Sequence, residues 1–414
     1  MQPTTLFYIL IGIILLRFAI DQWLNSLNSS YFDRPIPAEL EGVYEPERYQ
    51  RSQAYKKEKS RFGTSYAIVS MVATLAFLFL DGFAWVDSWA RGISNNEIAV
   101  ALLFFGVIGL ANDLISTPFS YYNTFVIEEK YGFNRKSKKL FWVDKFKGYL
   151  LGGLIGGGLL ALIIWIYQNF GTDFWWYAWI ALGVFSIFMN LFYARLIVPL
   201  FNKQTPLEAG ELKTQIESYA QKVGFKLNNI FVIDGSKRSS KANAYFSGFG
   251  REKRITLFDT LIQQLDTAEI VAVLAHEVGH YKKRHVIYNL LTSLLLTGFT
   301  LWLLGLMVSS PLLAQALGVS IPSFHVGLVA FAVIYTPVSE VTGLLMNRLS
   351  RKFEYQADRY ASETYQGQPL EDALIKLSRE HLSNLTPHPT YVNVHYSHPP
   401  LIDRVLHLRG LRSY

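Results

Sequence analysis

Long apolar runs separated by charged loops dominate the chain. Seven of these runs are long enough, or nearly so, to cross about 30 Å of hydrocarbon as helices. They lie at about 5–20, 65–86, 98–119, 148–168, 174–198, 286–308 and 324–346. The pattern therefore predicts a mainly α, seven-helix integral membrane protein. The first run lacks a basic leading segment and a small-residue cleavage site, which favours an uncleaved anchor over a signal peptide.

The loops between the runs alternate in positive charge. Loops 21–64 and 120–147 are rich in Lys and Arg, whereas the loop between them has only Arg91. The turn near Gly171 and the loop 309–323 contain neither Lys nor Arg. Because basic loops stay in the cytoplasm, the N-terminus is predicted to face out and the C-terminus to face the cytoplasm. The alternative is six spans, with the first run lying in the membrane interface.

Composition agrees with a membrane protein. Only 17% of the 414 residues are charged, against about 25% in soluble domains, and 15% are aromatic. The absence of cysteine excludes disulfides and any thiolate metal site. The net charge of +7 resides mostly in the loops, so membrane lipid rather than nucleic acid is the expected partner.

Two segments, 200–285 and 347–414, have the polarity of water-soluble structure, and both fall on the cytoplasmic side. The first predicts an α+β unit with a polar helix, three short strands, and a second helix from about Thr267 that Asp266 or Thr267 caps. The polar helix and the strands are expected at Glu211–Val223, Asn229–Ile233, Ala244–Phe249 and Arg254–Phe258. The chain thus divides into membrane regions 1–199 and 286–346 and soluble segments 200–285 and 347–414.

The strongest chemical motif is His276-Glu277-Val278-Gly279-His280. On a helix the two histidines stand one turn apart on the same face, so both imidazoles can bind one Zn²⁺. Glu277 then points beside the metal, where a base for a catalytic water belongs. A catalytic zinc site also needs a third protein ligand and one open position.

A carboxylate is the expected third ligand. Metzincin-type motifs continue with Gly and His, and the corresponding positions here are Lys283 and Val286. Glu354 and Asp358 are again one turn apart, which suits a ligand and an acidic partner for a ligating histidine. Two spans separate His280 from Glu354, so the chain returns to the face it left. Glu340 is the reserve ligand, and a surface ion pair of Glu354 with Arg351 or Lys352 is the alternative reading.

The order of these motifs resembles the Ste24 family of CAAX prenyl proteases, which are M48-type gluzincins. The resemblance rests on HEVGH, two spans, SRKFEYQAD and then Ser397-His398-Pro399-Pro400. It extends to residues 120–134, 198–202 and 239–246, and so covers nearly the whole chain. It implies a gluzincin-type zinc-protease domain joined to seven helices that enclose a water-filled chamber. Acidic residues near or inside the apolar runs suit a wetted interior, namely Asp81, Asp113 and Glu340.

The resemblance also assigns roles by position. It implies that one Zn²⁺ per chain is bound by His276, His280 and Glu354, with Glu277 as general base and Asp358 as the acid behind the ligands. Asn243 matches a residue beside the substrate-binding edge strand, and His398 matches one that faces the scissile carbonyl. The residues agree with this, because a strand beginning Ala244-Tyr245 can bind an extended peptide by β-addition. A histidine such as His398 can donate to a developing oxyanion.

The substrate implied by the resemblance is a prenylated CAAX C-terminus that loses its last three residues. In a bacterium without protein prenylation, quality control of membrane proteins is the better reading. The compact length favours the bacterial inner membrane over the endoplasmic reticulum membrane. A non-enzymatic transporter or chaperone with a vestigial zinc site is the rival from another class, and it predicts that Glu277 is dispensable.

Overall fold

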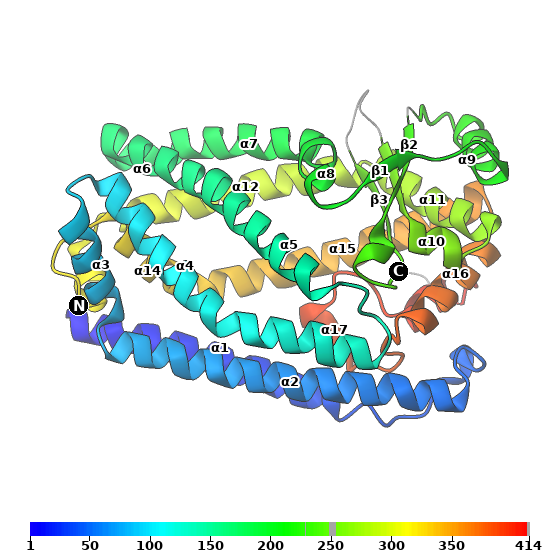
Figure 1. The fold of residues 1–414 in the computed structure, drawn as a ribbon, viewed down its shortest axis with the longest axis horizontal. Helices are drawn as coiled ribbons and strands as arrows, with labels where there is room; N and C mark the ends of the chain where they lie inside the picture. Colours follow the sequence, from blue (N-terminus) through cyan, green and yellow to red (C-terminus); the bar gives the residue numbers. More distant parts are fainter. Residues whose placement is uncertain (228, 248–253, 412–414) are drawn as a thin grey trace.

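The computed structural model describes residues 1–227, 229–247 and 254–411. Long helices run along the longest dimension of the molecule, and a small sheet with shorter helices packs at one end (Figure 1). The helices of the long-helix part are α1 (Pro3–Ser29), α2 (Pro46–Phe79), α3 (Gly82–Ile93), α4 (Glu97–Tyr122), α5 (Lys138–Leu151), α6 (Gly158–Phe170), α7 (Phe174–Leu196), α8 (Val198–Phe201), α12 (His285–Met307), α13 (Pro311–Ala316), α14 (Phe324–Ile334) and α15 (Thr336–Thr364).

Five helical stretches of the described residues are long and apolar enough to cross a membrane. They are Pro3–Ser29, Pro46–Phe79, Glu97–Glu128, Lys138–Phe201 and His285–Met307. A sixth is formed if α14 and α15 count as one bent span. The predicted runs 148–168 and 174–198 both lie in Lys138–Phe201, where the chain turns back between α6 and α7 at Gly171, with φ of +54° (Figure 1). The mainly helical membrane fold is thus established, and the count of seven stays a prediction.

The last predicted run, 324–346, is broken rather than straight. α14 ends at Ile334, and α15 begins at Thr336 at an angle of 57°. Pro337 in the first turn of α15 accounts for the break, because it has no N–H to give the preceding turn. α15 then continues to Thr364, so the boundary predicted at 346/347 falls inside a helix that carries Glu354 and Asp358.

The sheet has the strand order β1-β2-β4-β3. β2 (Asn229–Ile233) and β4 (Arg254–Phe258) pair in parallel, and β3 (Ala244–Ser247) lies antiparallel on β4 as an edge strand. The strand predicted at Ala244–Phe249 corresponds to β3, but residues 248 and 249 lie outside the described part. β1 (Gln204–Pro206) was not predicted, because three residues that include a proline carry no alternating hydrophobic pattern.

Shorter helices surround the sheet. They are α9 (Glu211–Lys222), α10 (Asp259–Gln264), α11 (Thr267–Lys282), α16 (Gly367–Glu380), α17 (Pro389–His395) and α18 (Leu401–Leu408). Side chains of β4 and α11 share one hydrophobic core, including Leu257, Ile270 and Leu274. Each such fully buried side chain contributes about 1.5–3 kcal/mol.

The start of α11 follows the predicted capping pattern. Asp266 accepts a hydrogen bond from the Glu269 N–H at 3.0 Å, and the Glu269 carboxylate accepts one from the Asp266 N–H at 2.9 Å. This capping box satisfies two backbone donors that the first turn would otherwise leave open. Asp266, and not Thr267, is therefore the cap. The cap fixes the residue at which the helix starts, and this determines which side of α11 carries the side chains of the HEVGH motif.

α11 packs against α15 at very short range. A Cβ added to Gly279 would lie 3.1 Å from both the Cα and the carbonyl oxygen of Ala357. These are backbone atoms, so they cannot move aside as a flexible side chain would. The glycine within HEVGH therefore allows the two helices that carry the predicted metal ligands to approach each other.

We expect Gly279→Ala to destabilise the protein by about 1–3 kcal/mol, because the added methyl group overpacks the contact with Ala357. Thermal unfolding in detergent would measure the loss. Gly63→Ala is the matched control, since it is also helical and an added Cβ there meets nothing within 4 Å. Equal stability of the two variants would contradict the close approach of α11 and α15.

Candidate metal centre

Three predicted ligands converge between α11 and α15. His276 and His280 come from α11 and Glu354 from α15, and their ligand atoms all lie within 4.8 Å of one another. The Glu354 carboxylate is 3.5 Å from His276 Nε2 and 3.3 Å from His280 Nε2. His276 and Glu354 are buried, and His280 is half-buried. The site thus has two buried ligands and one half-buried ligand.

The three candidate ligands present their metal-binding atoms to a common point, where those atoms are poorly hydrogen-bonded to one another. The two Nε2 atoms face each other at 3.1 Å, and the buried Glu354 Oε2 accepts no hydrogen bond. His398 Nδ1 lies 3.0 Å from that oxygen without forming one. Two imidazole nitrogens and a carboxylate oxygen are the ligand set of catalytic sites with a fourth position open. A metal ion held by His276, His280 and Glu354 would satisfy all of these atoms.

A buried ion network holds His276 from behind. Asp358 Oδ1 lies 2.8 Å from His276 Nδ1, at the distance of a hydrogen bond. Arg404 of α18 donates to both Asp358 oxygens, at 2.5 and 2.9 Å. A partner on Nδ1 fixes the ring orientation and leaves Nε2 free to bind a metal.

Sequence reasoning did not find Arg404, and it also missed the support of the second histidine. His280 Nδ1 is 2.9 Å from His285 Nδ1, and His285 Nε2 is 2.8 Å from Gln356 Oε1. His285 follows the motif by five residues, and this proximity in sequence was the one signal that could have indicated its contact with His280. Arg404 is 46 residues from Asp358 in sequence, in a short amphipathic helix, so no spacing rule points to it.

Burial and ion pairing act in opposite directions on His276. Burial of the ring lowers its pKa, but the hydrogen bonds to Asp358 and Glu354 outweigh burial and raise the pKa to about 9. In the metal-free protein, His276 is therefore protonated at neutral pH, and a metal ion must displace that proton to bind.

The predicted base and the predicted substrate strand lie next to each other. Glu277 is half-buried and lines a small cavity with Ala244 and Tyr245 of β3. Asn243 is exposed, and its Oδ1 accepts a hydrogen bond from the Ala244 N–H at 2.9 Å. Glu277 therefore faces the start of the edge strand, as a base acting on a peptide bound there would require.

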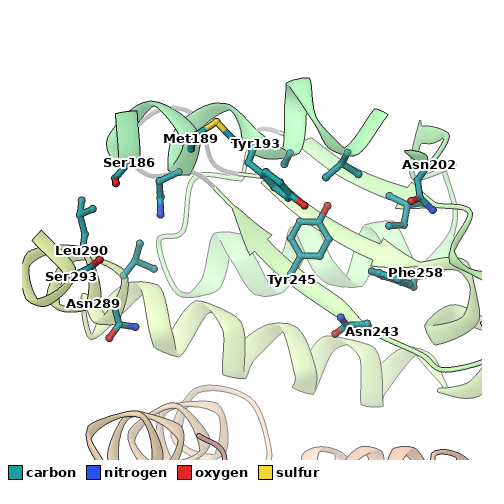
Figure 2. Close-up of a pocket in the computed structure, with 15 residues that line it drawn as sticks. Ser186, Met189, Tyr193, Asn202, Asn243, Tyr245, Phe258, Asn289, Leu290 and Ser293 are labelled. Carbon is teal, nitrogen blue, oxygen red and sulfur yellow. The ribbon is translucent and has the colours of Figure 1, made fainter. Parts of the chain in front are cut away.

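A cavity of about 820 Å³ adjoins this strand on its other side. It lies between α7, α12 and the sheet, and Figure 2 shows Tyr245 pointing across it toward Tyr193. Asn243 also lines this cavity. It lies directly before the edge strand and is not one of the three metal-binding candidates. Polar side chains of α7 and α12 reach the cavity, including Asn190 and Asn289.

The remaining acidic candidates lie elsewhere. Glu340, the reserve ligand, pairs with Arg17 of α1 at 3.2 Å and is not in the three-ligand group. Asp113 pairs with Lys145 at 2.6 Å, and Asp81 is the residue before α3. His398 reaches the site from the loop before α18 with 67% of its side chain exposed, which leaves it open to a bound molecule.

Comparison with known proteins agrees with this site and extends over the whole chain. Residues 5–203 match the family model for the CAAX prenyl protease N-terminal region with five membrane helices, and residues 206–412 match peptidase family M48. The chain belongs to peptidase family M48. It is accordingly an integral membrane metallopeptidase, as the hydrophobic runs and the HEVGH motif predicted.

Individual relatives cover nearly the full length. A CAAX prenyl protease 1 homolog of Oryza sativa is 38% identical over 91% of each chain, and CAAX prenyl protease 1 of Saccharomyces cerevisiae is 36% identical over 96% of this chain and 94% of its own. The crystal structure of S. mikatae Ste24p superposes with a TM-score of 0.93 at 35% identity, covering 97% of this chain and 99% of that one. The similarity to these proteins thus covers the membrane part of the chain as well as the part that carries the metal centre.

We expect the affinity of the metal-free peptidase for Zn²⁺ to rise with pH, because each bound ion displaces the His276 proton. The sign follows from the raised pKa: protons compete below about 9 and no longer compete above it. Affinity should climb about tenfold per pH unit between about pH 6 and 8 and level off near the pKa. Competition titrations with a chelating dye would measure it, and a flat profile would contradict the assignment.

We expect Asp358→Asn to weaken metal binding by about 10–100-fold, because the amide holds the His276 ring less firmly and lowers its basicity. Metal content after dialysis against a graded chelator would report the change. Asp372→Asn is the control, since Asp372 accepts a hydrogen bond from Gln368 at the surface, on another helix. Unchanged retention in Asp358→Asn would show that Asp358 does not act on the metal site.

Proposed function

We propose that the chain is a zinc endopeptidase that removes the last three residues of prenylated CAAX-type proteins or peptides. One Zn²⁺ per chain is held by His276, His280 and Glu354. The observation that carries this proposal is the convergence of those three ligands beside Glu277 and an edge strand. The relatives named CAAX prenyl protease 1, each matched over most of its length, support the substrate class.

Each nearby side chain has one task in the cleavage. When bound, a zinc ion supplies Lewis-acid chemistry that acidifies water and polarises a peptide carbonyl. Glu277 takes the proton from the attacking water and passes it to the leaving amine. His398 donates a hydrogen bond to the oxyanion that develops on the carbonyl. Asp358 and Arg404 keep the His276 ring in one orientation.

The substrate is bound as an added strand. The edge strand β3 presents backbone groups at Ala244, and Asn243 and Tyr245 flank them. An extended peptide can pair with that edge and bring one of its carbonyls to Glu277, which shares a cavity with Ala244. We place the site at the cytoplasmic face, because the basic segments 21–64 and 120–147 meet each other and the residues before β3, through Tyr55, Glu128 and Lys241.

We expect Glu277→Gln to lower the cleavage of a farnesylated CAAX peptide by at least about 10²–10⁴-fold, because the amide cannot accept a proton. Zinc content should be kept, since Glu277 is outside the ligand group. Detergent-purified protein and a quenched fluorescent peptide would give the rates, and an exposed acid supplies the control variant, Glu217→Gln.

Each result of this assay has a distinct meaning. Cleavage lost on both Glu277→Gln and zinc chelation supports the proposal. Glu277-dependent cleavage of an unprenylated hydrophobic peptide, with the farnesylated one untouched, would overturn the prenyl specificity and favour quality control. Cleavage indifferent to Glu277 would contradict the mechanism.

A further inference from the structure

The free edge of β3 has a fixed pattern of outward-facing backbone groups. The Phe258 N–H donates to the Asn243 carbonyl, and Tyr245 pairs with Thr256, so Asn243 and Tyr245 face β4. Because alternate residues of a strand point their N–H and C=O groups to opposite sides, those of Ala242 and Ala244 face outward. A peptide added to this edge would pair at Ala244 first, beside Glu277, and at Ala242 next.

The position at Ala242 is already taken. The Ala242 N–H donates to His381 Nε2 at 2.9 Å. His381 follows α16 directly and is fixed by the end of that helix, where its own N–H bonds to the Leu377 carbonyl. An added strand can pair with Ala244 once it displaces the local Asn243 side-chain oxygen from the Ala244 N–H, but it meets an imidazole ring at Ala242. At about 3.3 Å per residue, this block stands two to three residues beyond the bond that Glu277 would cut.

Three lysines lie close together near His381, at the end of the β3 edge. Lys241 Nζ lies 3.1 Å from Glu128 Oε2, and Lys59 Nζ lies 3.1 Å from Glu128 Oε1, so one carboxylate serves two lysines. Lys56 lies close enough to act electrostatically on Lys241, and within the described residues it has no carboxylate partner. The nearby acid Glu380 is held by Arg48 at 2.9 Å. The end of the edge thus carries cationic charge that the chain itself leaves unbalanced.

His381 is a neutral hydrogen-bond donor in this setting. Burial and the charge of Lys241 lower the pKa of His381 to about 4. Since Nε2 accepts from Ala242, the single proton of the neutral ring lies on Nδ1. Nδ1–H can therefore donate to a carboxylate that arrives at the end of the edge.

We propose that His381 closes the substrate edge of β3 and that Lys56 and Lys241 beside it bind the C-terminal carboxylate of the substrate. This inference rests on the proposed function. It assigns to these three residues the selection of a removed peptide of three residues. The charge fixes the direction as well: a carboxylate at Lys241 requires a substrate antiparallel to β3. With the cut bond opposite Ala244, the strand pairing ends at the His381 ring, and the carboxylate of the third residue beyond the bond lies beside His381 and Lys241.

The test compares one prenylated peptide in two forms, with a free C-terminal carboxylate and with a carboxamide. We expect the unmodified enzyme to cleave the acid at least about tenfold better in kcat/KM, in keeping with a hydrogen-bonded charge. Lys56→Met should reduce this acid-to-amide ratio toward one, and Lys56→Arg should restore much of it. Lys57→Met is the control, because Lys57 pairs with Asp33 at 2.6 Å on the adjacent helical position.

A second pair of peptides tests the block. A substrate lengthened by two residues at its C-terminus should be cleaved poorly, and His381→Gly should raise its rate relative to the normal peptide. Equal cleavage of acid and amide by the unmodified enzyme, or an acid preference unchanged in Lys56→Met, would overturn the inference while Glu277-dependent cleavage still supports the proposed function. Unhindered cleavage of the lengthened peptide would overturn the block at Ala242.

Discussion

The contact between α11 and α15 is the constraint on which the rest of the structure depends. Gly279 lets the backbone at Ala357 approach, and one turn away His276 meets Asp358 in a buried ion network completed by Arg404. Burying charged groups costs free energy unless each is paired. The network therefore tolerates one mutual position of the two helices, and that position brings Glu354 to the two histidines.

The chain between α11 and α15 passes through the membrane helices α12 and α14. α11 ends at Lys282, and the chain turns at Arg284, with φ of +61°, directly into α12. It returns through α14 and the bend before Pro337 into α15, which carries Glu354 without a further break. The metal centre is consequently built where the bundle meets the sheet, and the edge strand β3 opens onto the same place (Figure 1).

Local rules of sequence predicted much of this arrangement. The spacing of His276 and His280 set their common helix face, and the two intervening spans identified Glu354 as the acid that returns to them. Residue type also predicted a cap at Asp266 or Thr267, and the structure shows that Asp266 is the cap. Features set by long-range packing were not predictable: Arg404 reaches Asp358 across 46 residues, and β1 forms from a segment with no strand pattern. The break before Pro337 had a readable cause, but hydropathy alone treats the run as continuous.

Anomalous diffraction at the zinc absorption edge, from crystals of the purified protein, tests the central claim most directly. The account predicts one strong peak per chain, in contact with Nε2 of His276 and His280 and with the Glu354 carboxylate. A peak held instead by the histidines of the C-terminal segment, such as His395 and His398, would contradict it. So would a zinc-loaded protein whose His276, His280 and Glu354 hold no metal between them.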